Sequence, residues 1–257
     1  MNDEHLGQLR DHGYCIVPGL LAESVVGDIV DQAEREFDVL GHMAQSKAMW
    51  SLRTRPELRR MFESIYATSD LIVSFDGMTK KPPGGSGLVL NYHVDQTQSR
   101  KSCVQAVVAL KPSNAATGSL CLLKGSHREH AAMLERYSVD TDEEVWQFLP
   151  LEENDPLVSS CETVQPSLEV GDVVLWDSRT VHAVTPPRDA AASRLVAYVC
   201  MVPRTFASAR TLERRRLAFE SGMYSTHWPH LFVTREDVRN GPTMRWADAP
   251  AAVAALV

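Results

Sequence analysis

The sequence predicts a mainly β protein, an antiparallel sandwich or barrel flanked by helices, and two observations support this fold class. From Leu71 to Val202, short β-branched and apolar runs alternate with Gly, Pro, Asn and Asp, the pattern of many short strands joined by turns. Before this region, apolar residues recur at i, i+3, i+4 and i+7, as in amphipathic helices. We expect one domain over residues 1–257, because β-rich domains of this length are commonly single. It divides into N-terminal helices at about 1–68, a β-core at about 70–203, and a lid-like helix and loop at about 205–246.

The N-terminal part is expected to contain three helices and one strand. The first helix has leucines on one face and is followed by Gly13, which tolerates the positive φ of a helix end. The third helix begins at Pro56, a residue suited to a first turn. The predicted elements are helices at Asp3–His12, Ala22–Leu40 and Pro56–Thr68 and a strand at Tyr14–Val17.

The central part is expected to contain seven strands. They are placed at Leu71–Asp76, Leu88–Val94, Val104–Leu110, Gly118–Leu123, Asp172–Trp176, His182–Val184 and Leu195–Val202. The segment Ala131–Val164, with Val145–Leu149 in its middle, is polar and irregular, and we interpret it as a functional loop between strands.

The C-terminal part begins with a basic helix predicted over Ala209–Ser221 and capped by Gly222. A loop at Tyr224–Pro229 follows, carrying two aromatic residues and a histidine. The alanine-rich stretch Ala247–Val257 is expected to be peripheral or frayed.

Composition excludes several classes of function. A net charge of −7 gives no reason to expect nucleic acid or an anionic membrane as the partner. Five scattered cysteines without CxxC spacing indicate reduced thiols, and no apolar run reaches the roughly 20 residues that a membrane span needs. The first residues are acidic and lack the order of a signal peptide, so we expect a cytoplasmic protein. Its oligomeric state is not predicted.

The chemistry is expected around His93 and Asp95, which lie two residues apart in a strand-like run. Side chains at i and i+2 of a strand leave the same face, so this imidazole and carboxylate can meet one cation. His182, on a later predicted strand, is the best third ligand, and two His with one carboxylate form the facial triad of non-haem Fe(II) oxygenases. Arg194, twelve residues further on, is placed to bind a carboxylate through two parallel hydrogen bonds.

Ordered motifs around these residues resemble the phytanoyl-CoA dioxygenase family of Fe(II)- and 2-oxoglutarate-dependent oxygenases, from about Leu6 to Pro203. The matching segments are Leu9–Leu21, Lys80–Gly84, Tyr92–Asp95, Gly118–His127 and Gly171–Asp177, followed by His182. The resemblance implies a double-stranded β-helix (jelly-roll, cupin-like) core. It also implies that His93, Asp95 and His182 bind Fe(II) and that Arg194 holds the distal carboxylate of 2-oxoglutarate.

The sequence departs from this family pattern at two positions. Lys124 stands where the family usually has proline, and Val184 stands where it often has a small hydroxyl residue. A second hydrogen bond to the co-substrate is therefore expected from another residue. The candidates are Lys80, Tyr92, Thr97 and Gln105.

The reaction implied by the resemblance consumes 2-oxoglutarate and O2, releases succinate and CO2, and oxidises an unactivated C–H of a small-molecule substrate, either a specialised metabolite or an amino-acid-like compound. Relatives that halogenate have a small residue in place of the carboxylate, so Asp95 favours hydroxylation. Desaturation or cyclisation by the same iron centre is an alternative. Two other classes are a non-catalytic jelly-roll binding protein and a zinc hydrolase, which uses similar ligands.

Several other residues have a structural interpretation. His127 is expected to be a structural hydrogen-bonding residue, Trp176 core packing, and His130 and the pair His227 and His230 surface or loop histidines. The Arg214–Arg216 cluster is expected on a solvated helix face. Alternatively, the C-terminal helix and loop cover the iron pocket and bind substrate. The substrate-binding candidates are then Arg210, Arg214, His227 and Trp228.

Overall fold

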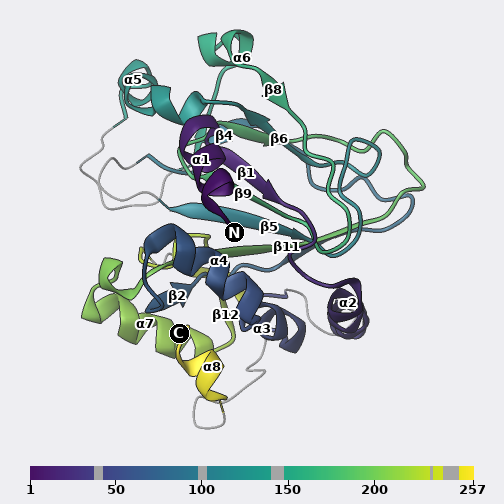
Figure 1. Cartoon of the computed structure of the whole chain (residues 1–257), viewed down its shortest axis with the longest axis vertical. Coiled ribbons are helices and arrows are strands. Elements are labelled where there is room, and N and C mark those ends of the chain that lie inside the picture. Colours follow the sequence, from purple (N-terminus) through teal and green to yellow (C-terminus); the bar gives the residue numbers. More distant parts are fainter. Residues whose placement is uncertain (38–42, 98–102, 140–147, 232–233, 240–248) are drawn as a thin grey trace. The chain divides into compact units, whose positions relative to one another are not determined.

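The structure is a computed structural model that describes residues 1–37, 43–97, 103–139, 148–231, 234–239 and 249–257. The chain forms two compact units (Figure 1). Asn2–Gly19 and Thr79–Val196 make up the first, called the β unit, and Leu20–Met78 and Ala197–Val257 make up the second, called the helical unit. The prediction of a single functional domain stays a prediction.

The β unit contains two antiparallel sheets. In the first sheet the order is β1 (Tyr14–Val17), β9 (Val173–Asp177) and β5 (Val104–Ala109), and the N–H of Leu110 donates to Leu195 near the start of β11 (Arg194–Pro203). In the second sheet the order is β7 (Leu149–Pro150), β4 (Leu90–Val94), β10 (His182–Val184), β6 (Leu120–Leu123) and β8 (Thr163–Val164). Every residue of β5 and β9 is buried, which explains why these strands are continuously apolar.

Helices cover the outer face of the second sheet. A 3-10 turn (Ser126–Glu129) leads into α5 (His130–Arg136), and α6 (Pro156–Ser160) lies near α5 and β8 in the upper part of Figure 1. Apolar side chains of both helices pack with the sheet in one buried cluster. Its members are Val94, Leu123, Met133, Leu134, Leu151, Leu157 and Val181. The side chains of the opposite face of this sheet include His93 and His182.

The N-terminal helix α1 (Asp3–His12) packs beside β1 in the same unit. It begins where the Asn2 side chain accepts a hydrogen bond from the His5 N–H. It ends at Gly13, whose φ of 81° lies in the left-handed region. The helix, its glycine stop and strand β1 all have the predicted bounds.

The helical unit contains the remaining elements. Its helices are α2 (Glu23–Phe37), α3 (Lys47–Arg53), α4 (Pro56–Tyr66), a 3-10 turn (Arg204–Phe206), α7 (Ala209–Glu220) and α8 (Ala251–Ala254). The strand β2 (Leu71–Val73) pairs with the later part of β11, and β12 (Met223–Ser225) pairs with β13 (Thr234–Arg239). The strand β3 (Met78–Lys81) connects the two units along the chain. No helix among the described residues is long and apolar enough to cross a membrane.

The predicted strands and the helices at α1, α2, α4 and α7 are present, with ends that move by a few residues. Residues 38–40 of the second predicted helix lie outside the described residues, as do 140–147 of the Ala131–Val164 segment. That segment is not the irregular loop expected, because it continues α5 and holds β7, α6 and β8. The helix α3 and the strands β3, β12 and β13 were also not predicted. Within the predicted loop, Tyr224 and Ser225 belong to β12.

Two expectations about the C-terminal part are wrong. Residues 249–257 are not frayed, because Leu256 and Val257 are buried; residues 247 and 248 lie outside the described residues. Arg215 is not on a solvated face, because its side chain is fully buried and donates to the carbonyls of Val73, Pro229, Leu256 and Val257. Burial lowers the pKa of Arg215 to about 9, and four carbonyl acceptors partly replace the water that this cation loses.

Candidate metal centre

Three side chains with metal-ligating atoms meet on the inner face of the second sheet. His93 lies near the end of β4, Asp95 follows one residue after that strand, and His182 begins β10. The antiparallel register pairs His93 directly with His182, which places both imidazoles on one face. One ligand atom from each residue lies within 4.8 Å of the others, and all three residues are buried. The predicted triad is therefore brought together by the pairing of β4 with β10.

Backbone carbonyls orient both imidazoles. Nδ1 of His93 is 2.7 Å from the carbonyl oxygen of Asn91, and Nδ1 of His182 is 2.9 Å from that of Thr180. A carbonyl only accepts, so Nδ1 of each ring donates to it, and Nε2 is the nitrogen that remains to bind a metal. Nε2 of His93 and of His182 lie 3.8 Å and 3.1 Å from the carboxylate oxygens of Asp95. The second hydrogen bond of each ring thus presents the metal-binding nitrogen to the centre.

The first sheet supports the carboxylate and one imidazole from the opposite side. Nε2 of Gln105, on β5, donates to Oδ2 of Asp95 over 3.0 Å, and Gln105 is buried. The ring of Trp176, on β9, lies 5.3 Å from that of His182, which confirms the predicted packing role of this tryptophan. The triad therefore lies between the inner faces of the two sheets of the β unit.

The turn before His182 is held by the end of α1. The carbonyl of Gly13 accepts from the Asp177 N–H and from Oγ1 of Thr180, each over 2.9 Å. A Cβ at Gly13 would lie 2.5 Å from Nδ1 of His127, so only glycine fits. Nε2 of His127 in turn donates to the Arg10 carbonyl over 3.0 Å, as expected for a structural histidine.

The turn after Asp95 is held by a second buried network. Nε2 of His130 donates to the carbonyl of Gln96, whose side-chain oxygen accepts from Oγ of Ser178. His130 is buried, and this burial lowers its pKa. The expectation that His130 and His230 are surface or loop histidines is wrong for His130, which is buried in α5. His230 does lie in a turn, but it is buried and packs 5.3 Å from the ring of Trp228.

The donor set fits a divalent metal ion. Ligands ~2.1 Å from one ion and at right angles to one another lie about 3 Å apart. Nε2 of His182 is 3.1 Å from Oδ2 of Asp95, and one ligand atom of each of the three residues lies within 4.8 Å of the others. Two neutral imidazole nitrogens and one carboxylate oxygen on one side leave the other side open to further ligands. The same residues therefore offer a facial site for iron.

Arg194, the predicted carboxylate anchor, is buried at the start of β11. Its Nε donates to Oγ of Ser113 over 3.1 Å, and it forms no ion pair with any residue that the structure describes. The loop before it is fixed by the buried ammonium of Lys81, which donates to the carbonyls of Asp189, Ala190 and Ala192. A buried guanidinium without a carboxylate partner suits an anionic ligand.

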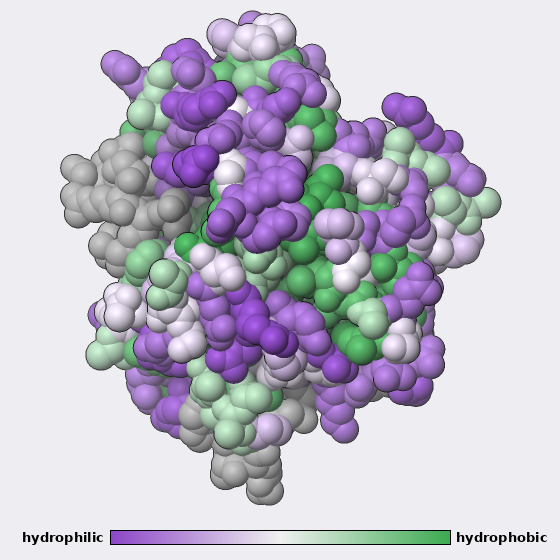
Figure 2. Space-filling view, in the orientation of Figure 1, coloured by the Kyte–Doolittle hydropathy of each residue, from purple (hydrophilic) through white to green (hydrophobic). Residues whose placement is uncertain are grey.

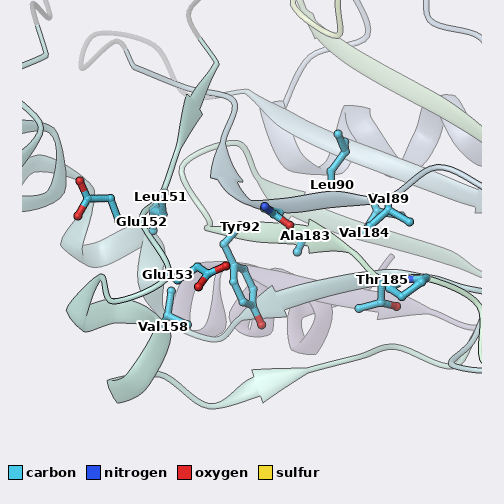
Figure 3. Close-up of a pocket in the computed structure, with 12 residues that line it drawn as sticks. Val89, Leu90, Tyr92, Leu151, Glu152, Glu153, Val158, Ala183, Val184 and Thr185 are labelled. Atoms are coloured by element: carbon cyan, nitrogen blue, oxygen red, sulfur yellow. The ribbon is translucent and has the colours of Figure 1, made fainter.

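The other co-substrate candidates are placed differently. Gln105 contacts the triad through Asp95, Thr97 is buried, and Lys80 is half-buried. Tyr92 lies on the outer face of β4, where its hydroxyl is 3.5 Å from Sγ of Cys121. It lines a pocket of about 330 Å³ together with Ala183 and Val158 (Figure 3), so it does not face the triad.

The substrate candidates Arg210, Arg214, His227 and Trp228 belong to the helical unit. Arg210 and Arg214 are exposed on α7, His227 is half-buried, and Trp228 is buried. Their role in substrate binding stays a prediction.

The sequence reasoning missed one residue beside the triad. The ring of Phe148 lies 4.5 Å from the ring of His93, measured between centroids. In the sequence, the aromatic residues of Val145–Leu149 were the available sign of this residue. The pairing of β7 with β4 was needed to place Phe148 beside the triad.

The family model for phytanoyl-CoA dioxygenase (PhyH) matches residues 41–194, more than half of the chain, and this range contains the triad and Arg194. The chain belongs to the phytanoyl-CoA dioxygenase family. A second family model, Gig2-like, matches residues 145–247.

One relative is similar to most of this chain. "Ava biosynthesis cluster protein O" from Aspergillus versicolor is 30% identical over 207 residues, which cover 75% of this chain and 66% of the relative, slightly less than two thirds of its length.

Solved structures show the fold. The epimerase SnoN in complex with Fe3+, alpha ketoglutarate and nogalamycin RO has a TM-score of 0.59 and 20% identity, covering 79% of this chain and 84% of that one. The carbocyclase SnoK from nogalamycin biosynthesis has a TM-score of 0.60 and 19% identity, covering 78% and 83%. Together with the two antiparallel sheets, these matches confirm the predicted double-stranded β-helix fold.

Proposed function

We propose that this protein is an Fe(II)- and 2-oxoglutarate-dependent oxygenase that hydroxylates an unactivated C–H of a small-molecule specialised metabolite. The observation that carries the proposal is the buried His93, Asp95 and His182 triad, with Nε2 of both imidazoles facing the Asp95 carboxylate. Family membership supports it, and SnoN is a relative by fold whose structure contains iron and alpha ketoglutarate.

Each residue has a defined role in this proposal. With Fe(II) bound, 2-oxoglutarate and O2 are converted to succinate and CO2 while a substrate C–H is oxidised. His93, Asp95 and His182 hold the metal, and Gln105 keeps the Asp95 carboxylate in one orientation. Arg194, set by Ser113, binds the distal carboxylate of 2-oxoglutarate through its remaining donors.

The presence of Asp95 favours hydroxylation over halogenation, because the carboxylate occupies the position that a halide would need. Epimerisation and ring closure are the alternative outcomes, since SnoN is an epimerase and SnoK a carbocyclase. The two alternatives use the same metal centre and are distinguished by the product.

The test is anaerobic addition of Fe(II) and then 2-oxoglutarate to the purified protein. A weak visible charge-transfer band is expected, because the co-substrate chelates the iron. The band should disappear in His93→Ala with the circular dichroism spectrum unchanged, and it should persist in the control His12→Ala, a half-buried histidine of α1 outside the triad. A zinc hydrolase or an empty binding protein gives no band in the wild type, and that result would contradict the proposal.

Turnover is tested by adding candidate metabolites and measuring succinate. Stimulated release is expected with the true substrate, and mass spectrometry of the product then distinguishes a gain of one oxygen from loss of two hydrogens or no change in mass. Protein that binds iron and 2-oxoglutarate, yet releases no succinate with any small molecule, would contradict the small-molecule part of the proposal.

A further inference from the structure

We propose that Phe148 forms one wall of the substrate site and selects substrates with a flat aromatic ring system. The inference rests on the proposed function, because it assigns the space beside His93 to the substrate. It goes further by naming a specificity residue and a class of substrate.

Strand pairing fixes the side on which Phe148 lies. In the antiparallel pair β4–β7, Pro150 is opposite His93 and Leu149 is opposite Val94. Leu149 packs against the buried apolar cluster on the outer face, together with Val94. Because successive side chains of a strand alternate between faces, Phe148 lies on the inner face, the same face as His93. Phe148 immediately precedes β7, and its ring contact with His93 agrees with this side of the sheet.

The ring of Phe148 covers the imidazole of His93 and is itself open to solvent. The two ring centroids are 4.5 Å apart with 32° between the planes, which is close to an offset stack. His93 is only 2% exposed, whereas Phe148 is 41% exposed. One face of Phe148 is thus used by a metal ligand while much of the ring is available to another molecule.

Such an exposed ring is uncommon on this protein. Among the described residues, the large apolar side chains that are exposed are Leu88, Val89, Phe148 and Leu217, and Figure 2 shows hydrophilic residues over much of the visible face. Of these four, only Phe148 is aromatic and contacts a residue of the triad. Aromatic rings prefer offset or edge-to-face contact with other rings, so a flat aromatic substrate gains more here than a flexible chain does.

The experiment measures binding of 1,8-dihydroxyanthraquinone, a flat ring system, to protein loaded with Ni(II) and 2-oxoglutarate, which does not turn over. We expect Phe148→Ala to weaken binding about tenfold, because an aromatic contact and its buried area are lost together. Phe148→Tyr keeps the ring and should bind within about twofold of the wild type. Leu88→Ala is the matched control, since Leu88 is 39% exposed in the same unit and precedes β4 at its other end.

Decanoic acid is the comparison probe, because it is apolar but has no ring. The inference is overturned if Phe148→Ala binds the anthraquinone as tightly as the wild type, if the wild type binds decanoic acid but not the anthraquinone, or if Leu88→Ala has the same effect as Phe148→Ala. Circular dichroism and Ni(II) affinity measured for each variant exclude loss of fold or of metal as the cause.

Failure of the proposed function gives a different result. In that case Ni(II) and 2-oxoglutarate do not bind to the wild type in a direct titration. Anthraquinone binding that depends on Phe148 without any metal would still support the aromatic wall, whereas metal and co-substrate binding without dependence on Phe148 would reject the wall and keep the oxygenase.

Discussion

Gln105 offers a sharp test of how this metal centre is built, because it contacts the triad without being a ligand. Its Nε2 donates to Oδ2 of Asp95 over 3.0 Å, and the same oxygen lies 3.1 Å from Nε2 of His182. Gln105→Leu removes the donor and keeps a side chain of similar volume in a buried position. The carboxylate then loses the contact that sets its rotation.

The expected size of the effect follows from the bond that is lost. A buried hydrogen bond to a charged group contributes about 1.5–3 kcal/mol, but this bond exists both with and without metal. Only the cost of orienting a freed carboxylate when the metal binds affects affinity, so we expect the lower end of the 10–100-fold range typical of such supporting residues. Gln105→Leu should therefore bind Ni(II) about tenfold more weakly, which corresponds to about 1.4 kcal/mol.

The assay is a competition titration of Ni(II) against a chelating indicator. Gln165→Leu is the control, because Gln165 donates to the hydroxyls of Ser119 and Thr185 in the same unit and does not touch the triad. Its metal affinity should equal that of the wild type. If Gln105→Leu also binds Ni(II) as tightly as the wild type, the proposed orientation of Asp95 by Gln105 is wrong.

Three further predictions concern the surroundings of the site. Arg194→Leu should weaken binding of 2-oxoglutarate at least about 30-fold, because one partner of a buried charge pair is removed, and isothermal titration should find Ni(II) affinity unchanged. Gly13→Ala should lower the free energy of unfolding in urea by about 1–3 kcal/mol, since φ is 81° and the added Cβ meets His127, whereas Gly7→Ala inside α1 should raise it by about 0.5–1 kcal/mol. Burial lowers the pKa of His130 below its usual 6.5, so the unfolded chain binds the proton first, and stability should fall as the pH drops below 6.5.

Each of these three predictions would be contradicted by a specific result. A loss of metal together with 2-oxoglutarate in Arg194→Leu would indicate a damaged fold and not a missing anion partner. If Gly13→Ala and Gly7→Ala change the free energy of unfolding equally, the close packing at Gly13 between α1 and the turn before His182 does not contribute to stability. If the free energy of unfolding of His130→Gln falls between pH 7 and pH 5 as much as that of the wild type, then His130 is not the source of this pH dependence.

The metal ligands could be predicted from the sequence because their geometry is local or follows strand periodicity. His93 and Asp95 are two residues apart, and the Gly-Asp turn before β9 indicated the region that leads to His182. The bounds of α1 were predicted for the same reason, since Asn2 and Gly13 act on their own helix. Each of these features depends on a few neighbouring residues.

The features that were missed depend on partners far apart in the sequence. The polar appearance of Arg214–Arg216 predicted a solvated face, but Arg215 is buried because four carbonyls from distant segments accept from it. Tyr92 and Gln105 were grouped as co-substrate ligands, yet strand alternation directs Tyr92 to the outer face and Gln105 to Asp95. Phe148 could be placed only once the register of β7 on β4 was known.

The position of His182 illustrates why the supporting residues matter as much as the ligand. Its ring is oriented by the carbonyl of Thr180, whose hydroxyl donates to Gly13 at the end of α1. Val181 stands between Thr180 and His182, and its N–H donates to Oγ of Ser126. The β unit therefore holds the two residues before this histidine through Gly13, 167 residues from Thr180, and Ser126, 55 residues from Val181. A ligand defined by contacts of such separation is pre-oriented before the metal arrives, because the folded β unit has already paid the entropy of ordering it.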